Sequence, residues 1–252
     1  MVSIGIQTVF KRYELKYKIS ADEKERILSA IAPHMALDAY GRVTVRNIYF
    51  DTESYRLVRR SIEKPTYKEK LRVRSYAQAT HESTVFVELK KKYGGVVYKR
   101  RLALSESLAM RWLSGEISCP QNTQIGREIA YFIRYYGPLR PTVFLSYERE
   151  AYYERGGGDF RITFDENILC REKDVDLCTA PYGTPILPKD TALMELKCAG
   201  GIPLWMVRVL SREKIYKTPF SKYGTAYEKL IFPAIMAGGA NLGGEAIYGC
   251  NF

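Results

Sequence analysis

The sequence predicts an α+β fold in which an antiparallel β-sheet closes into a barrel around a tunnel and helices pack outside it. Two observations lead to this. The predicted strands are joined mostly by links of hairpin length rather than by regular crossovers. Charged residues also stand two apart inside segments that otherwise resemble buried strands. Because side chains at i and i+2 of a strand share a face, the sheet should have one apolar and one charged face. Closure would turn the charged face inward and the apolar face toward the helices.

Six segments carry such pairs of polar residues. The pairs are Glu14 and Lys16, Arg72 and Arg74, Glu88 and Lys90, Lys99 and Arg101, Tyr147 and Arg149, and Glu195 and Lys197. Any one pair is most simply a solvated strand face with cross-strand ion pairs. Six pairs in one chain instead indicate a continuous charged surface.

The first half of the chain alternates strands with short helices. Ser20 and Glu23 form a capping box that begins a helix directly after the first strand. Gly94 and Gly95 are a hairpin signal that should pair the strands on either side. The predicted strands cover residues 9–19, 43–52, 67–77, 83–92 and 96–104, with a short helix over 53–60.

The second half begins with helices and returns to strands. Helices are predicted from Ser105 and over 123–136, strands over 142–153, 160–169 and 192–200, and helices again over 202–215 and 221–236. We expect one domain over residues 1–236, followed by a Gly-rich tail over 237–252.

The formal net charge of +11 over 252 residues indicates an anionic partner. The bases are spread over the strands rather than gathered in a tail, which favours a concave site and gives no reason to expect a specific nucleic-acid partner. Five cysteines without a CxxC motif, and only two histidines, predict reduced thiols in the cytoplasm and no zinc site. Because no apolar run is long enough to span a membrane, we expect a membrane protein only as a partner.

The charged face predicts phosphate chemistry. Its bases are Lys16, Arg72, Arg74, Lys90, Lys99, Arg101, Arg149 and Lys197, with Arg161 as a further candidate; its acids are Glu14, Glu88 and Glu195, with Asp165 as a further candidate. So many cations on one surface repel one another unless an anion such as a polyphosphate joins them. Carboxylates can hold Mg²⁺ or Mn²⁺ beside phosphates, and the two groups together suit phosphoryl transfer.

Three further residues have competing interpretations. Ser221 and Lys222 stand where a helix should begin, and a helix start favours phosphate, although Ser221 on its own is simply a helix cap. Tyr147 is either a core hydroxyl or a phosphate contact. His81 lies in a polar loop and is expected to be a surface residue rather than a base.

An ordered series of motifs resembles the VTC domain, the polyphosphate polymerase module among the triphosphate tunnel metalloenzymes. The motifs are KLRVRSY, VFVELKKK, GVVYKRR, SYERE, TFD, MELK and SKYGTA, and the likeness spans roughly residues 9–235. The resemblance implies a basic tunnel inside an antiparallel barrel, a site for Mn²⁺ or Mg²⁺, and transfer of the ATP γ-phosphate to a polyphosphate chain. In the related CYTH proteins the first strand carries ExExK, of which only Glu14 and Lys16 are in register here, and this favours the VTC branch.

The resemblance also implies roles for individual residues. Phosphates would be contacted by Lys16, Arg72, Arg74, Lys90, Lys99, Arg149, Lys197 and Lys222, with help from Tyr147 and Ser221; the metal would be held by Glu195. Glu14 and Glu88 remain open between metal ligands and partners of nearby lysines, and Arg101 is an added phosphate contact. The alternatives are a triphosphatase acting on inorganic or nucleoside triphosphate, a non-catalytic polyphosphate binder, and a generic binder of nucleic acid.

Overall fold

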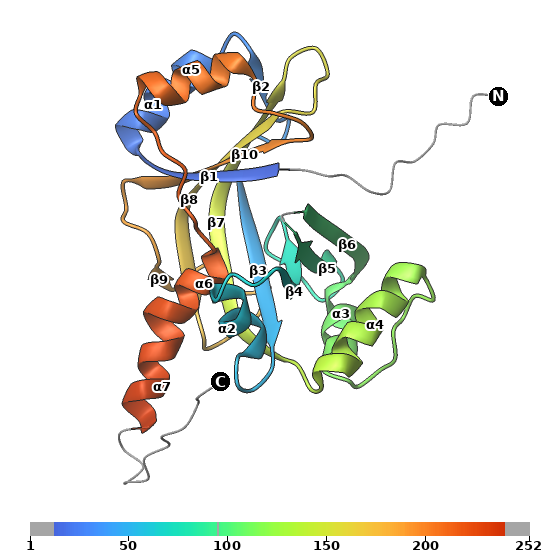
Figure 1. Cartoon of the computed structure of the whole chain (residues 1–252). Coiled ribbons are helices and arrows are strands. Elements are labelled where there is room, and N and C mark those ends of the chain that lie inside the picture. Colours follow the sequence, from blue (N-terminus) through green and yellow to red (C-terminus); the bar gives the residue numbers. More distant parts are fainter. Residues whose placement is uncertain (1–12, 95, 240–252) are drawn as a thin grey trace, which may run out of the picture.

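A computed structural model describes residues 13–94 and 96–239 of the chain (Figure 1). The strands are β1 (Tyr13–Ser20), β2 (Met35–Leu37), β3 (Val43–Asp51), β4 (Tyr67–Ser75), β5 (Thr84–Tyr93), β6 (Val96–Ser105), β7 (Arg140–Glu154), β8 (Arg161–Arg171), β9 (Thr184–Pro185) and β10 (Thr191–Cys198). The helices are α1 (Ala21–Ile31), α2 (Arg56–Ile62), α3 (Glu106–Leu113), α4 (Gln124–Tyr136), α5 (Leu204–Arg212), α6 (Lys222–Ala226), the π-helix η1 (Tyr227–Ile231) and α7 (Phe232–Gly239).

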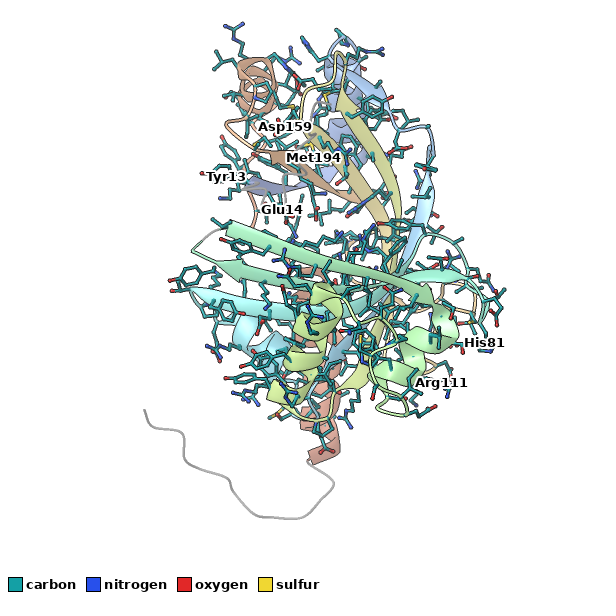
Figure 2. All side chains as sticks on the ribbon, turned by 90° about the vertical axis from the view of Figure 1, so that its right-hand side faces the viewer. Tyr13, Glu14, His81, Arg111, Asp159 and Met194 are labelled. Atoms are coloured by element: carbon teal, nitrogen blue, oxygen red, sulfur yellow. The ribbon has the colours of Figure 1, made fainter. Side chains whose placement is uncertain are left out.

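All the strands join one antiparallel sheet, in the order β1-β10-β8-β7-β3-β4-β5-β6 with β2 and β9 at its sides. Within the described residues β1 and β6 are not hydrogen-bonded to each other, so the prediction of a closed barrel is wrong and the sheet is open. Figure 2 shows β1, with Glu14, lying over the edge formed by β5 and β6. Side chains span this gap instead of backbone groups, because Lys90 Nζ of β5 lies 2.8 Å from Glu14 Oε2 of β1.

The convex face of the sheet is apolar and carries helices, as the sequence predicts. At one end Leu71, Val87 and Leu104 pack with Trp112 of α3 and Phe132 of α4. At the other end residues of β1, β8 and β10 pack against α1 and α5. Ser20 caps α1 through the predicted capping box, since its Oγ accepts from Glu23 N and Glu23 Oε2 accepts from Ser20 N.

The concave face has an apolar end that the sequence does not predict. Val143 and Leu145 of β7 pack there with Tyr223 of α6 and Tyr227 of η1. The Tyr223 hydroxyl donates to Asp51 Oδ2 at 2.9 Å, which fixes α6 against β3. The helix expected over 221–236 is therefore not an outer helix along its whole length. Its first turns fill one end of the concave face, and the charges occupy the other end.

Several smaller expectations can be compared with the structure. β2 and β9 are absent from the prediction because three and two residues are too few to show a periodicity. The first strand was predicted from residue 9, but residues 9–12 lie outside the described part, as does most of the predicted tail over 237–252. Among the described residues, no helix combines the length and the apolarity that crossing a membrane requires.

Candidate functional site

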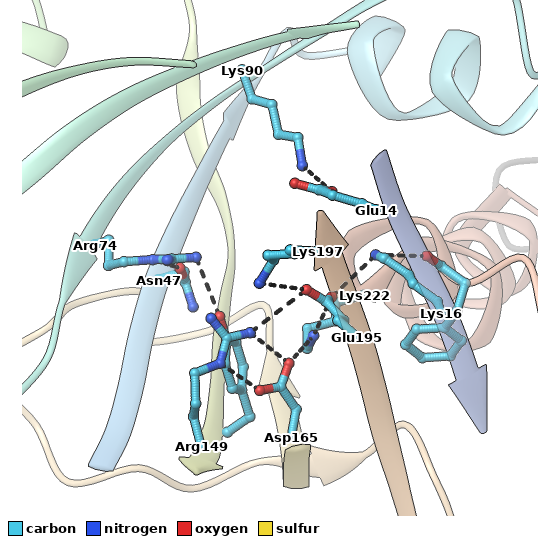
Figure 3. A network of polar contacts seen from close by, with 12 residues as sticks. Glu14, Lys16, Asn47, Arg74, Lys90, Arg149, Asp165, Glu195, Lys197 and Lys222 are labelled. Carbon is cyan, nitrogen blue, oxygen red and sulfur yellow. Dashed lines mark hydrogen bonds and ion pairs between the residues drawn. The ribbon is translucent and has the colours of Figure 1, made fainter. Parts of the chain in front are cut away.

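The charged end of the concave face brings together nearly all of the predicted site residues, in two clusters with contacts between them. Figure 3 shows the cluster around Glu195 and Asp165, with Arg74, Glu14 and Lys90 nearby. The Glu195 cluster consists of Lys16, Arg149, Asp165, Glu195, Lys197 and Lys222. The Glu88 cluster consists of Arg72, Arg74, Glu88, Lys99 and Arg101. Arg161 is exposed near the start of β8 and lies outside both clusters.

The Glu195 cluster is built on β1, β10, β8, β7 and the start of α6. Arg149 donates two hydrogen bonds to the Asp165 carboxylate, of 2.6 and 2.7 Å, and Lys222 Nζ lies 2.5 Å from Asp165 Oδ2. Glu195 lies within 3.5 Å of the ammonium groups of Lys16, Lys197 and Lys222. Burial raises the pKa of each carboxyl, but these cations outweigh burial and lower both pKa values. Both acids are therefore ionised at neutral pH.

The Glu88 cluster places one carboxylate among four cations of β4 and β6. Glu88 is 1% exposed, and its oxygens lie 2.7 Å from Arg72, 2.8 Å from Lys99 and 2.5 Å from Arg101. Arg74 is more distant, at 3.8 Å. Burial raises the pKa of Glu88, and the surrounding charges, Arg72 first, lower it far more. This acid holds the arginines in fixed positions.

Two contacts lie between the clusters, one of them from β1 to β5, the strand that carries Glu88. Glu14 pairs with Lys90, and although burial raises its pKa, Lys90 and Lys197 bring the pKa down to about 2. Arg74 Nη2 donates to the hydroxyl of Tyr147 at 3.2 Å. Burial raises the pKa of Tyr147, but the cations Arg149 and Arg74 lower it to about 8. The hydroxyl of Tyr147 is thus a strong hydrogen-bond donor in a cationic surrounding.

The start of α6 is held on the charged face by side chains. Ser221 Oγ caps α6 by accepting from Gly224 N at 3.1 Å, and it also accepts from Lys70 Nζ at 2.8 Å. Lys16 Nζ donates to the carbonyl of Phe220 at 3.0 Å. The helix start predicted at Ser221 is confirmed, and these contacts are the reason that Lys222, only 8% exposed, points into the Glu195 cluster.

Sequence reasoning missed two residues of this surface. Lys70 precedes Arg72 by two positions and so shares its face, a signal that the i, i+2 rule could have used. Burial and the neighbouring cations, Lys16 first, lower the pKa of Lys70 to about 7. Thr163 pairs with Glu195 across β8 and β10, and its Oγ1 is buried without a hydrogen-bond partner. That hydroxyl lies beside Glu195 without a hydrogen bond of its own, so it is a candidate ligand contact.

The carboxylates suit a metal that takes few ligands from protein. Among the described residues, Glu14, Glu88, Asp165 and Glu195 do not gather into a group of three whose oxygens converge. An octahedral Mg²⁺ or Mn²⁺ usually takes one or two carboxylates and completes its shell with water and substrate phosphates. Glu195, beside the unsatisfied hydroxyl of Thr163, fits that arrangement, whereas a cage made only of protein ligands does not.

Comparison with solved structures identifies the class of fold. A proposed adenylate cyclase from Bacillus halodurans superimposes with a TM-score of 0.52 and 16% identity, over 84% of this chain and 95% of the other. A proposed adenylyl cyclase from Hippeastrum, described as having a dominant triphosphatase activity, gives 0.52 and 16% over 84% and 93%. These values show that this chain shares the fold of these adenylate-cyclase-like proteins.

The family follows from a comparison with family models. The VTC domain matches residues 11–231, which is most of the chain, so this protein belongs to the VTC domain family. A comparison with curated proteins found no match. The resemblance based on the motifs of the sequence is thereby confirmed.

Proposed function

We propose that this protein transfers the γ-phosphate of ATP to the end of a polyphosphate chain, with the help of Mg²⁺ or Mn²⁺. One observation carries the proposal: bases on the concave face outnumber the acids by more than two to one. These bases come from strands at both ends of the sheet and from the start of α6. The bases are Lys16, Lys70, Arg72, Arg74, Lys90, Lys99, Arg101, Arg149, Lys197 and Lys222, against Glu14, Glu88, Asp165 and Glu195. A chain of phosphates supplies the missing negative charge along such a surface.

The residues would act mainly by positioning and by neutralising charge. Arginine forks bind phosphate oxygens in pairs, so Arg72, Arg74 and Arg149 would orient the triphosphate. A terminal phosphate oxygen of the chain then attacks the γ-phosphorus, the bond to the β-phosphate oxygen breaks, and ADP leaves with that electron pair. Lys197 and Lys222 would stabilise the charge that spreads over the γ-phosphoryl oxygens.

The proposed metal ligand is Glu195, with Glu14 as a second candidate. A bound divalent ion would draw charge from the phosphate oxygens and favour departure of ADP. Glu88 is already enclosed by four cations, so its proposed role is to hold Arg72 and Arg101 in place. Lys16 and Lys222 contact Glu195 in the structure, and on ligand binding both would be shared between this carboxylate and phosphate.

Hydrolysis of a triphosphate is a second candidate. It is favoured by the similarity to the Hippeastrum protein, which is described as having triphosphatase activity. Water would then attack the terminal phosphorus in place of the chain end, and the same cations would serve. Binding of polyphosphate without turnover uses the same surface and is the third outcome of the test.

The test is incubation with ATP and Mn²⁺ or Mg²⁺, followed by measurement of long polyphosphate, ADP and free phosphate. Long chains with ADP support the polymerase; free phosphate without chains supports the hydrolase; no turnover in the presence of tight polyphosphate binding supports the binder. The variants Glu195→Ala and Arg74→Ala should abolish turnover in either enzyme. Arg100→Ala is the matched control, since Arg100 neighbours Arg101 on β6 but pairs with Glu128 of α4. Turnover at the wild-type level in both site variants would contradict the assignment.

A further inference from the structure

A cluster of side chains that could hold a metal ion lies away from the charged end of the concave face, which we call the phosphate surface. His81 from the β4–β5 connection, Glu106 from the first turn of α3 and Cys178 from the segment between β8 and β9 each offer a ligand atom, and these atoms lie within 4.8 Å of one another. Figure 2 shows His81 clearly separated from Glu14, which marks the charged end of the concave face. The site therefore does not share residues with the phosphate surface.

We propose that His81, Glu106 and Cys178 form a zinc site with a water molecule as fourth ligand. Imidazole nitrogen, carboxylate oxygen and thiolate sulfur are the three ligand types that Zn²⁺ takes in proteins. A tetrahedral zinc site needs ligand atoms about 3.3 to 3.6 Å apart, given its usual bond lengths. Nδ1 of His81 and Oε2 of Glu106 already lie 3.0 Å apart, so small side-chain rotations suffice.

Hydrogen bonds to backbone carbonyl groups hold the three segments in this arrangement. The N–H of Ser107 donates to the carbonyl of His81 at 3.0 Å, which places the first turn of α3 beside the histidine. Gln78 Nε2 donates to the carbonyl of Cys178 at 2.6 Å, and Ala79 N donates to that of Leu177 at 3.0 Å. The ligands are thus brought together by hydrogen bonds that do not involve the ligand atoms themselves.

The ligands differ in burial. The side chain of Glu106 is 6% exposed, and that of His81 is 81% exposed, so the ion has both a buried anchor and open access. Cys178 is half-buried and free of disulfide bonds. When zinc binds, the thiol proton leaves to solvent as the Zn–S bond forms, so the affinity for zinc should rise with pH.

Zinc bound at this site would attach the long loop between β8 and β9 to the elements beside it. The segment between β8 and β9 contains no regular secondary structure over residues 172–183, and Cys178 lies within it. Zinc would tie this segment to both α3 and the β4–β5 connection. The sequence gives no sign of such a site because motif spacing relates only neighbours along the chain, whereas these three residues come from distant segments.

The experiment uses Co²⁺ as a spectroscopic substitute for Zn²⁺, with the full chain kept reduced and freed of metal by chelation. The wild type should show the near-ultraviolet charge-transfer absorption of a cobalt–thiolate bond, and Zn²⁺ should displace it. Cys178→Ser should lose this absorption, and His81→Asn should weaken cobalt binding at least about tenfold. Cys119→Ser is the matched control, because Cys119 is also half-buried and free.

Two readouts keep folding separate from metal binding. In chelator, Cys178→Ser and the wild type should unfold at the same temperature, and added Zn²⁺ should raise that temperature only in the wild type and in Cys119→Ser. A wild type without the thiolate absorption, or a Cys178→Ser variant that retains it, overturns the proposal. Because Glu195 and Glu14 offer only oxygen ligands, metal bound at the phosphate surface gives no such signal and cannot be mistaken for this site.

Discussion

Replacing Glu88 by glutamine should make the protein less stable and yet a better binder of phosphate chains. The substitution leaves Arg72, Arg74, Lys99 and Arg101 close together without their common acid. Removing one partner of a buried ion pair costs about 3–5 kcal/mol. The side chains of Lys99 and Arg101 are 41% and 34% exposed, and solvent screens them. We therefore expect the low end, a loss of about 3 kcal/mol in the free energy of unfolding.

Affinity should change in the opposite direction because Glu88 competes with the ligand for the same cations. If a bound anion restores about 1.4 kcal/mol of the loss, tripolyphosphate binds the variant about tenfold more tightly than it binds the wild type. Urea unfolding with and without tripolyphosphate, together with calorimetric titration, measures both effects.

The control for this prediction is Glu128→Gln. Glu128 also pairs with an arginine, Arg100 at 3.0 Å, but both side chains are about a quarter to a third exposed, at 27% and 30%. That variant should lose no more than about 1 kcal/mol and bind tripolyphosphate like the wild type. A Glu88→Gln variant that is as stable as the wild type, or that binds tripolyphosphate more weakly, would refute the view that Glu88 balances the phosphate-binding cations.

Two further predictions concern residues that the sequence did not single out. Lys70 has a pKa of about 7, below its value in the unfolded chain, so the unfolded chain binds more protons between pH 7 and the usual lysine range and stability should rise with pH there. Phosphate binding should return the proton to Lys70, so titrations at pH 8 in buffers of different ionisation enthalpy should show proton uptake in the wild type and less in Lys70→Met. Thr163→Val removes a buried hydroxyl without a partner, so it should leave the unfolding free energy equal or higher while weakening triphosphate binding several-fold; unchanged affinity would show that Thr163 does not contact the ligand.

The charged face could be predicted from the sequence because strand geometry is local. A period of two fixes which residues share a face, and this alone brought Arg72 with Arg74 and Glu195 with Lys197 onto one surface. The same rule also places Lys70 on this surface, because Lys70 lies two positions before Arg72 on the same strand. From the sequence, Asp165 could be predicted only as a further candidate, because it stands inside the apolar run FRITFDENIL. Its contacts with Arg149 and Lys222 become apparent only when the strands are paired and α6 is placed.

The open edge of the sheet and the position of α6 depend on contacts between distant segments, and no local pattern encodes them. The spacing of Tyr223 and Tyr227 predicts that both lie on one face of a helix, but it does not predict which surface of the sheet this helix covers. The structure shows that it covers the concave face beside Val143 and Leu145. The metal-ligand candidates His81, Glu106 and Cys178 were missed for the same reason.

The acids of the concave face explain how so many cations can share one surface before a ligand arrives. Each carboxylate lies beside bases from other elements of the fold: Asp165 between Arg149 and Lys222, Glu14 against Lys90, Glu88 among the cations of β4 and β6. A phosphate chain must then exchange with these carboxylates rather than simply add to free cations. Under the proposed function, the affinity for the chain would be the difference between the free energies of two sets of ion pairs, and this difference would keep the affinity moderate. Under the proposed function, removing an acid that is not the metal ligand, such as Glu88, should therefore tighten binding of the chain but slow the release of product.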